Sequence, residues 1–243
     1  MKDFVTRSRI LRCMDIQFFG GKTYREFEIA SDENFEAGQY LMIRTGNREV
    51  NWPSPYFIHK KTAGGLVVLA REDQELYKSG LNDCVEYWGP RGTTPVDGKE
   101  SPILVTEQGA RFAVYPFICG NAYNRLIIVG HKREDIGQNS EMVEYCEEIG
   151  EISGLIGKDE SPVIGAFNPA AAKAFAKALS EERKKNTYIF VSNKKACGID
   201  GCKGCYLHND DTSFGINVCC KGPFMPLGII DFEVDGRCFE TFL

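Results

Sequence analysis

Four cysteines close to the carboxyl end are the residues whose types and spacing most clearly predict chemistry in this chain. Cys197 and Cys202 have four residues between them, Cys202 and Cys205 have two, and a later pair follows at Cys219 and Cys220. This C-x4-C-x2-C spacing with a later cysteine is typical of plant-type [2Fe-2S] ligation. The pattern therefore predicts that three thiolates, with a fourth from the later pair, bind a two-iron cluster.

Glycines alternate with these cysteines, at Gly198, Gly201 and Gly204. A diiron cluster is a compact anion, so the chain has to curl around it and turn backbone N–H groups toward the sulfurs. Glycine permits such a curl at the lowest conformational cost. The polar segment 206–218 then returns the last ligand from a separate part of the chain.

Two other uses of clustered cysteines stay open from the residues alone. A structural zinc site usually has two C-x2-C pairs, whereas this segment has one. Disulfides are disfavoured, because the first ten residues lack the apolar run of a secretory signal and a chain of this size does not need disulfide bonds to stabilise its fold. Iron–sulfur ligation is our preferred interpretation and zinc is the second.

The composition is that of an ordinary globular protein. Of the 243 residues, 43% are hydrophobic and 26% are charged, and the formal net charge is −5. The acidic balance, with no basic stripe, argues against a nucleic-acid partner, and no apolar run approaches the roughly 20 residues that cross a bilayer. Because free or cluster-bound thiols favour a reducing compartment, we expect a cytoplasmic protein with no membrane partner.

Residues 1–98 have the pattern of a small β-domain. Residues 24–29 alternate roughly between apolar and polar, and 40–43 and 66–70 are apolar runs; Gly, Asn and Asp separate these segments, which is typical of short antiparallel strands. Gly89-Pro90-Arg91-Gly92 breaks the chain near the end of this region. We therefore expect an antiparallel β-barrel.

Strands and helices alternate over the next region, residues 99–190, which indicates a parallel sheet covered by helices. Near-continuous apolar runs predict strands buried on both faces, at 103–105, 126–129 and 163–167. Helices are predicted at 139–149 and, with a proline in its first turn, at 169–185. The cysteines then occupy a third segment, 191–243, in which 229–234 is predicted to be a last strand.

The α/β region lacks the glycine-rich turn of a dinucleotide site. A pyrophosphate requires a run such as G-x-G-x-x-G between the first strand and its helix. The segment 106–113 retains only Gly109 and carries Glu107, which would repel a phosphate. The residues therefore do not support NAD binding at this turn. The three histidines, His59, His131 and His208, occur singly and are expected to be ordinary surface or hydrogen-bonded side chains.

The whole chain resembles the electron-transfer subunits of class 1B dihydroorotate dehydrogenases, within the ferredoxin–NADP reductase superfamily. The match is strongest over 191–224, where the run 196–205 resembles the cluster loop of the family and 219–224 its closing segment. This match identifies Cys219, rather than Cys220, as the fourth ligand. Upstream, 37–40 and 89–92 are similar to family motifs that precede a barrel strand and end the flavin domain.

The resemblance also implies an FAD site on the barrel, near Asn51, Pro53, Ser54, Gly89 and Gly92. The family motif R-P-x-S falls on 51–54, so its arginine is absent while a proline and the serine remain. Two family motifs of the NAD site fall on 107–116 and 165–169. The first, G-G-G-I-G-x-A-P, keeps one glycine, and the second, C-G-P, has lost its cysteine.

On this resemblance we expect an electron-transfer component of an oxidoreductase complex with no catalytic residue of its own. A [2Fe-2S] cluster held by Cys197, Cys202, Cys205 and Cys219 would pass electrons between FAD and a flavin-bearing catalytic dehydrogenase subunit, in a hetero-oligomer. Two alternatives stay open. One is a subunit of another flavin-dependent complex that does not use NAD, and the other is a non-catalytic metal-binding module.

Overall fold

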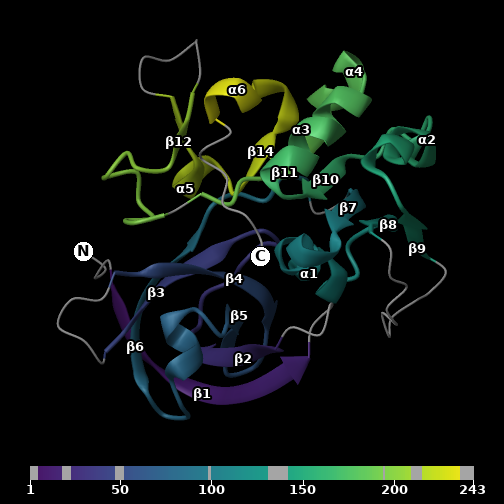
Figure 1. Ribbon diagram of the computed structural model, residues 1–243. Helices are drawn as coiled ribbons and strands as arrows, with labels where there is room; N and C mark the ends of the chain where they lie inside the picture. The colour runs from purple at the N-terminus through teal and green to yellow at the C-terminus, as the bar shows by residue number, and fades with distance from the viewer. Residues whose placement is uncertain are drawn as a thin grey trace.

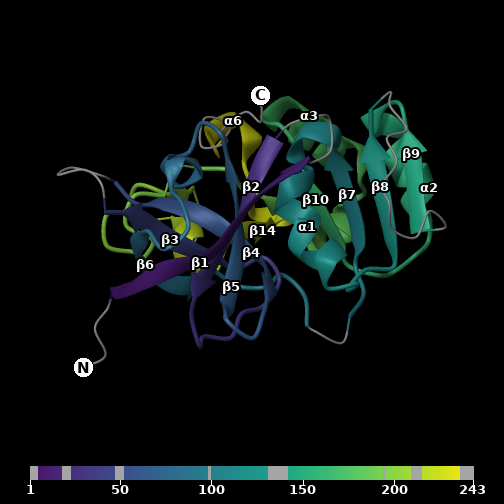
Figure 2. The ribbon, with the colours of Figure 1, turned by 90° about the horizontal axis from the view of Figure 1, so that it is seen from below.

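A closed barrel and a six-stranded sheet are the two main bodies of the computed structural model (Figure 1). The structure describes residues 5–17, 23–46, 52–97, 100–130, 142–193, 195–208 and 215–235. The barrel and the sheet lie side by side, and helix α1 (Arg111–Cys119) lies between them in both views (Figures 1 and 2). The expected combination of an antiparallel β-barrel and an α/β sheet is confirmed.

Six antiparallel strands close the barrel in the order β1-β2-β5-β4-β3-β6. These strands are β1 (Thr6–Gln17), β2 (Thr23–Ala30), β3 (Tyr40–Thr45), β4 (Ser54–Lys61), β5 (Gly65–Arg71) and β6 (Cys84–Arg91). Successive side chains of a strand point to opposite faces, so Tyr56 and Ile58 of β4 enter the barrel core. Phe57 and His59 therefore point outward, toward α1 and the sheet.

The sheet has the order β14-β11-β10-β7-β8-β9, and its strands are parallel except for β14. They are β7 (Ile103–Glu107), β8 (Arg125–Val129), β9 (Val143–Cys146), β10 (Val163–Ala166), β11 (Thr187–Phe190) and β14 (Phe224–Pro226). Helix α1 packs on one face through Ala113 and Phe117. Helix α3 (Pro169–Ala178) packs on the other face through Phe175.

The carboxyl-terminal segment leaves the sheet after β11 and returns to it as β14. Between these strands lie the cysteine loop, the two-stranded ribbon of β12 (Tyr206–Leu207) and β13 (Ile216–Asn217), and the short helix α5 (Val218–Lys221). Because β14 pairs with β11, the sheet anchors the end of the cysteine-bearing segment. Helix α6 (Phe232–Asp235) ends the described chain.

Two predicted elements are wrong. Where a helix was expected over 139–149, residues 139–141 lie outside the described ranges and 143–146 form the edge strand β9, whose aromatic and β-branched residues suit a sheet. The strand expected at 229–234 does not form. Its last three residues begin helix α6 instead, because the Asp231 carboxylate accepts hydrogen bonds from the N–H groups of Glu233 (2.9 Å) and Val234 (3.4 Å) and so caps this helix.

The predicted helix 169–185 is divided into α3 and α4 (Glu181–Lys185). Ser180 has an extended backbone, and its Oγ accepts a hydrogen bond from the N–H of Arg183 at 3.3 Å. Serine is a favoured N-cap residue because its side chain satisfies an N–H group that the helix leaves open. A new helix therefore starts where the alanine-rich pattern alone suggested continuation.

Candidate functional site

The four cysteines predicted as ligands come together in two pairs. The side chains of Cys197 and Cys202 interact with each other, and so do those of Cys205 and Cys219. Cys205 and Cys219 are buried, whereas Cys202 is exposed at the surface of the loop. The structure thus brings together a set of sulfurs that the spacing predicted, with one edge open to solvent.

Backbone N–H groups point at these sulfurs from within the loop. Cys197 Sγ accepts from the N–H of Ile199 (3.5 Å) and of Cys202 (3.4 Å). Cys219 Sγ accepts from the N–H of Asp200 at 3.4 Å, which joins the first part of the loop to the second pair of sulfurs. Such donors stabilise negative charge on sulfur, as the ligands of an anionic cluster require.

These contacts determine which thiols ionise most easily. The hydrogen bond from the Cys205 thiol lowers the pKa of Cys219 to about 6, although burial opposes this shift. The same contact raises the pKa of Cys205. Burial would raise the pKa of Cys197, but the N–H groups of Ile199 and Cys202 lower it below the ordinary value. Each pair therefore holds one thiol that is readily ionised.

The sulfurs meet as two pairs. Within the described ranges, no three His, Cys, Asp or Glu side chains converge as one metal ion requires. A structural zinc ion needs four ligands around a single point, whereas the four cysteines of a [2Fe-2S] cluster are divided between two irons. Which metal the loop binds stays a prediction.

The barrel holds the cysteine loop through strands β3 and β6. Trp88 on β6 donates its indole N–H to the carbonyl of Cys197 at 2.9 Å. Gly198 has a φ of +68°, and a Cβ there would lie 2.4 Å from Cγ of Met42 on β3. The positive φ and the close contact explain why glycine follows the first cysteine.

The closing part of the segment is held by the chain that leaves the barrel. Thr93 donates its N–H to the carbonyl of Gly222 at 2.8 Å and its hydroxyl to that of Lys221 at 2.8 Å. Gly92, which the resemblance placed near FAD, has a φ of +83°, and a Cβ there would lie 2.4 Å from the Gly222 carbonyl oxygen. In this structure Gly92 permits the close approach of the closing segment.

The other residues expected near FAD are spread over two barrel strands. Asn51 lies outside the described residues. Pro53 and Ser54 are half-buried where β4 begins, and Gly89 lies on β6, on the other side of β3. The placement of FAD near these residues stays a prediction.

A cavity of about 100 Å³ lies between the outer face of β4, helix α1 and the chain that follows β11. The aromatic rings of Phe57, Phe112 and Phe190 form part of its wall. Its polar lining includes His59 from the barrel and Ser192, Asn193 and Lys195 from the segment that follows β11. The sequence analysis did not single out this group, because only the packing of the two bodies brings it together.

Lys195 links this cavity to the cysteine loop. It is buried, and its ammonium group donates to the side-chain oxygen of Asn193 at 3.0 Å and lies 5.7 Å from the centre of the Tyr40 ring. The Tyr40 hydroxyl in turn donates to the carbonyl of Cys219 at 2.7 Å. A short polar and aromatic connection therefore joins the cavity to the second pair of sulfurs.

The sequence predicts no nucleotide site in the turn after β7. In the structure the carboxylate of Glu107 at this turn lies at the start of helix α3. Glu107, at the end of β7, accepts a hydrogen bond from the N–H of Asn168 at 2.6 Å, and Asn168 is the N-cap of α3. A helix N-terminus is a favourable position for an anion. Glu107 therefore adds negative charge beside the start of α3.

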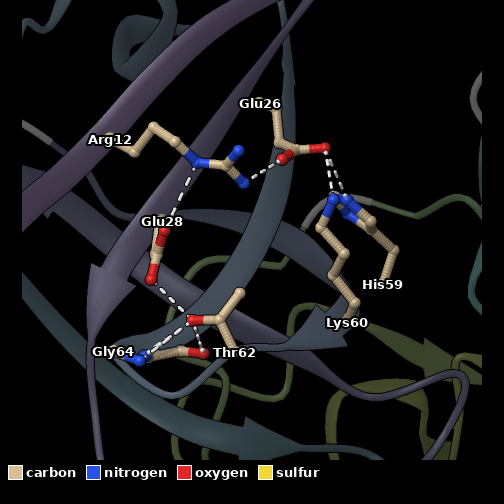
Figure 3. A network of polar contacts seen from close by, with 8 residues as sticks. Arg12, Glu26, Glu28, His59, Lys60, Thr62 and Gly64 are labelled. Atoms are coloured by element: carbon tan, nitrogen blue, oxygen red, sulfur yellow. Dashed lines mark hydrogen bonds and ion pairs between the residues drawn. The ribbon is translucent and has the colours of Figure 1, made fainter.

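The histidines differ from the expectation in one case. His208 is exposed, and His131 lies outside the described residues. His59 is buried, and its Nε2 lies 3.3 Å from the Glu26 carboxylate, as Figure 3 shows. The expectation of an ordinary, fully hydrogen-bonded histidine is wrong for His59, because its Nδ1 has no hydrogen-bond partner among the described residues.

Comparisons with known proteins agree with this architecture. No protein-family model matches the chain. An electron transfer subunit of dihydroorotate dehydrogenase B (NAD(+)) from Listeria monocytogenes is 25% identical over 214 residues, which cover 76% of this chain and 84% of that protein. The corresponding subunit from Listeria welshimeri is 24% identical with the same coverage.

Solved structures share the fold at low sequence identity. The ferredoxin NADP+ reductase of Neisseria gonorrhoeae, determined with bound FAD and NADP, matches with a TM-score of 0.54 at 15% identity, over 77% of this chain and 98% of that one. Phthalate dioxygenase reductase, described as transferring electrons from pyridine nucleotides to [2Fe-2S], matches with a TM-score of 0.58 at 14% identity, over 77% and 68%. No helix in the described ranges has the length and apolar character needed to cross a bilayer. The chain therefore has the fold of the ferredoxin–NADP reductases and is similar in sequence to electron transfer subunits of dihydroorotate dehydrogenase B.

Proposed function

We propose that this chain is the electron-transfer component of an oxidoreductase complex, with a [2Fe-2S] cluster on Cys197, Cys202, Cys205 and Cys219. The observation that carries the proposal is the pairing of these four side chains, with backbone N–H groups directed at three of the sulfurs, from Ile199, Asp200, Cys202 and Cys219. A bound cluster supplies one-electron chemistry, because it takes up a single electron at a time. The chain itself fixes the thiolates and stabilises their charge.

FAD is the second proposed cofactor. The similarity to flavin-containing reductases supports it, and we place it along β4, near Pro53 and Ser54, with Asn51, Gly89 and Gly92 as further candidates. The part that this chain would play is to hold the flavin on the barrel, against which the cysteine loop also packs. Tyr40 and Lys195 occupy the region between the cavity and the loop.

The relatives suggest the partner. They are named electron transfer subunits of dihydroorotate dehydrogenase B, so we propose that this chain joins a flavin-bearing catalytic dehydrogenase subunit in a hetero-oligomer. The partner would oxidise the substrate. A reducing cytoplasm suits this role, because the thiols of the described cysteines are free.

The two candidate functions differ in whether NAD exchanges electrons with this chain. Glu107 at the end of β7 and the loss of the glycine-rich turn do not favour NAD. We therefore keep, as the second candidate, a subunit of a flavin-dependent complex that does not use NAD. Mixing the purified protein with NADH under anaerobic conditions separates the two. Rapid bleaching of the flavin absorbance would contradict the NAD-independent reading.

Anaerobic purification with metal, sulfide and flavin analysis tests the proposed function directly. We expect about two irons and two sulfides per chain, a red-brown colour, and flavin released on denaturation. A colourless protein that contains one zinc ion would contradict the proposal and support a non-catalytic metal-binding module instead. A protein with its cluster and no flavin would restrict the role to a one-electron relay.

A further inference from the structure

Two buried aromatic side chains on the outside of the barrel each contact a different part of the cysteine-bearing segment. Tyr40 on β3 is fully buried, and Trp88 on β6 is 8% exposed. With Met42 they form a small apolar cluster that is distinct from the barrel core. Leu41 and Tyr87, the chain neighbours of Tyr40 and Trp88, point into that core, so Tyr40 and Trp88 point outward.

Each of these two side chains donates one hydrogen bond to the carbonyl oxygen of a predicted ligand. The Tyr40 hydroxyl donates to Cys219 at 2.7 Å, and the Trp88 indole N–H donates to Cys197 at 2.9 Å. Burial raises the pKa of Tyr40, so the hydroxyl keeps its hydrogen and remains a donor. Cys197 belongs to one pair of sulfurs and Cys219 to the other. The barrel therefore supplies one donor to each pair of ligands.

The contact from Trp88 fixes the peptide group between Cys197 and Gly198. Gly198 has a φ of +68°, and glycine adopts positive and negative φ about equally readily, so this peptide group could turn over if nothing held it. Its carbonyl instead points at the indole N–H, and a Cβ at Gly198 would lie only 3.3 Å from that nitrogen. Turning the peptide group over would break a buried hydrogen bond, which is unfavourable.

The two carbonyl oxygens also matter for redox chemistry. A carbonyl oxygen has a partial negative charge, and both of these oxygens belong to residues whose sulfurs are predicted to bind the cluster. An added electron makes the cluster more negative, so a nearby oxygen without a donor opposes reduction. A hydrogen bond offsets this effect, and it does so more strongly in a buried site of low dielectric constant. Donors such as Tyr40 and Trp88 therefore favour the reduced state.

We propose that Tyr40 and Trp88 are positioning residues of the metal centre, and that they act through the carbonyl groups of Cys219 and Cys197. They fix the two pairs of sulfurs relative to the barrel, and so to each other, and they raise the reduction potential of the bound cluster. The effect on the potential rests on the proposed function, because it requires a redox-active centre. The effect on position applies to any metal that the loop binds.

Tyr40→Phe removes the hydroxyl group and keeps the ring. In the full-length, cluster-loaded protein we expect the equilibrium constant for one-electron reduction to fall about tenfold, which corresponds to a midpoint potential lower by about 59 mV. Iron should be lost to a chelator about tenfold faster. Redox titration monitored by electron paramagnetic resonance measures the potential, and the absorbance of the iron–chelator complex gives the rate. An unchanged potential would overturn the effect on reduction, and an unchanged rate would overturn the positioning role.

Tyr87→Phe is the matched control. Tyr87 is 3% exposed, belongs to the barrel core and donates its hydroxyl to Ser31 Oγ at 2.9 Å. Both variants lose one hydrogen bond of a buried tyrosine, so they should lower the temperature of thermal unfolding to a similar extent. Only Tyr40→Phe should change the potential and the rate of iron loss. Equal changes in both variants would show a general loosening of the barrel and would contradict the inference.

Trp88→Phe tests the contact with the other pair of sulfurs. It removes the indole N–H, and we expect it to lower the potential and to speed iron loss, as Tyr40→Phe does. A folded Trp88→Phe variant with the potential and the iron retention of the unaltered protein would refute the role of Trp88. If this variant does not fold, Tyr40→Phe and its control still decide the inference.

Metal and sulfide analysis of the same samples keeps the two proposals apart. A protein that contains zinc and no sulfide would overturn the proposed function, and loss of zinc to the chelator would then show whether Tyr40→Phe releases its metal faster than Tyr87→Phe. A normal content of iron and sulfide, with Tyr40→Phe behaving as the unaltered protein does, would refute the inference and leave the proposed function intact.

Discussion

Two adjacent cysteines, Cys219 and Cys220, are the candidates for the fourth ligand, and their sulfurs lie 3.8 Å apart. Cys219 is fully buried and receives the N–H of Asp200, and its pKa is lowered to about 6. Burial and the neighbouring Cys219 raise the pKa of Cys220 to about 11. Because the thiolate is the metal ligand, these environments favour Cys219, in agreement with the family resemblance.

Substitution of the two cysteines should therefore have different effects. Cys219→Ser should reduce iron and sulfide to a small fraction of the level in the unaltered chain, because it removes the more readily ionised thiol of its pair. Cys220→Ser should keep both near two per chain. Iron and sulfide analysis, together with the visible spectrum after anaerobic purification, checks the outcome. Loss of the cluster in Cys220→Ser with retention in Cys219→Ser would show that the closing ligand is Cys220.

Lys195 is a buried positive charge near the second pair of sulfurs, where it lowers the pKa of Cys205 in opposition to larger effects that raise it. A nearby cation stabilises the more negative, reduced form of a cluster. Lys195→Met should accordingly lower the midpoint potential by on the order of tens of millivolts. The exposed Lys203, which pairs with Asp200 on the loop surface, provides the matched control, and Lys203→Met should change the potential much less because solvent screens it. Redox titration followed by electron paramagnetic resonance measures both, and equal shifts would argue against a special role for Lys195.

At the scale of elements, the cysteine loop depends on close packing against β3. Gly198→Ala should weaken cluster retention and lower stability by about 1–2 kcal/mol, because alanine does not tolerate the φ of +68° and its Cβ would clash with Met42. Gly201→Ala is the matched control, since a Cβ there would meet only Ile199, at an ordinary 3.8 Å. Thermal unfolding and the rate of iron loss to a chelator compare the two variants. Similar behaviour of both would mean that the loop does not dock on β3 as described.

The elements that the sequence predicts well are those whose signal is local. The cysteine spacing and the apolar runs of β7, β8 and β10 depend on neighbouring residues only, and the structure has strands at these runs. The edge strand β9 was not predicted, because a strand of four residues is too short to show a period of apolar residues. It is held by pairing with β8, and the residues of β9 alone do not indicate that pairing. The caps at Ser180 and Asp231 act through single side chains, which the apolar pattern does not register.

The cavity illustrates why part of the candidate site was not predictable. His59 and Asn193 are 134 positions apart in the chain, and they line one cavity because the barrel, α1 and the segment after β11 pack together at this point. The outward position of His59 follows from the alternation of β4, but nothing local indicates which element it faces. The proposed ligands of the cluster were found because three of them lie in a single short loop.

At the scale of the whole molecule, a buried charge network on the outside of the barrel connects its strands and reaches the α/β body. Glu26 on β2 contacts Arg12 on β1 and both His59 and Lys60 on β4 (Figure 3). The ring of His59 lies 5.4 Å from that of Tyr115 on α1. A buried carboxylate of this kind is stabilising only while it is ionised and paired, so the stability of the barrel and of its contact with α1 should depend on pH.

The sign of this dependence follows from the two pKa shifts. The pKa of His59 is lowered from 6.5, so below about pH 6.5 the unfolded chain takes up a proton that the folded chain does not, and stability begins to fall. The pKa of Glu26 is lowered from 4.5 to about 2, so its contribution is complete above pH 4.5 and is lost as the pH falls from there toward 2. A shift of this size corresponds to about 3 kcal/mol.

Glu26→Gln should remove most of this acid sensitivity below pH 4.5. At pH 7 the variant should unfold with a free energy lower by on the order of 3 kcal/mol, and the difference from the unaltered protein should shrink as the pH falls toward 3, where Glu26 becomes protonated in the unfolded state. Urea unfolding of both proteins at each pH gives the difference, which cancels any effect of acid on a bound cluster because both proteins share it. Glu181→Gln, at an exposed position on α4, should follow the unaltered protein throughout. Curves for Glu26→Gln that run parallel to those of the unaltered protein at every pH would mean that the network does not couple proton binding to folding, and that another group keeps His59 in place beside the cavity.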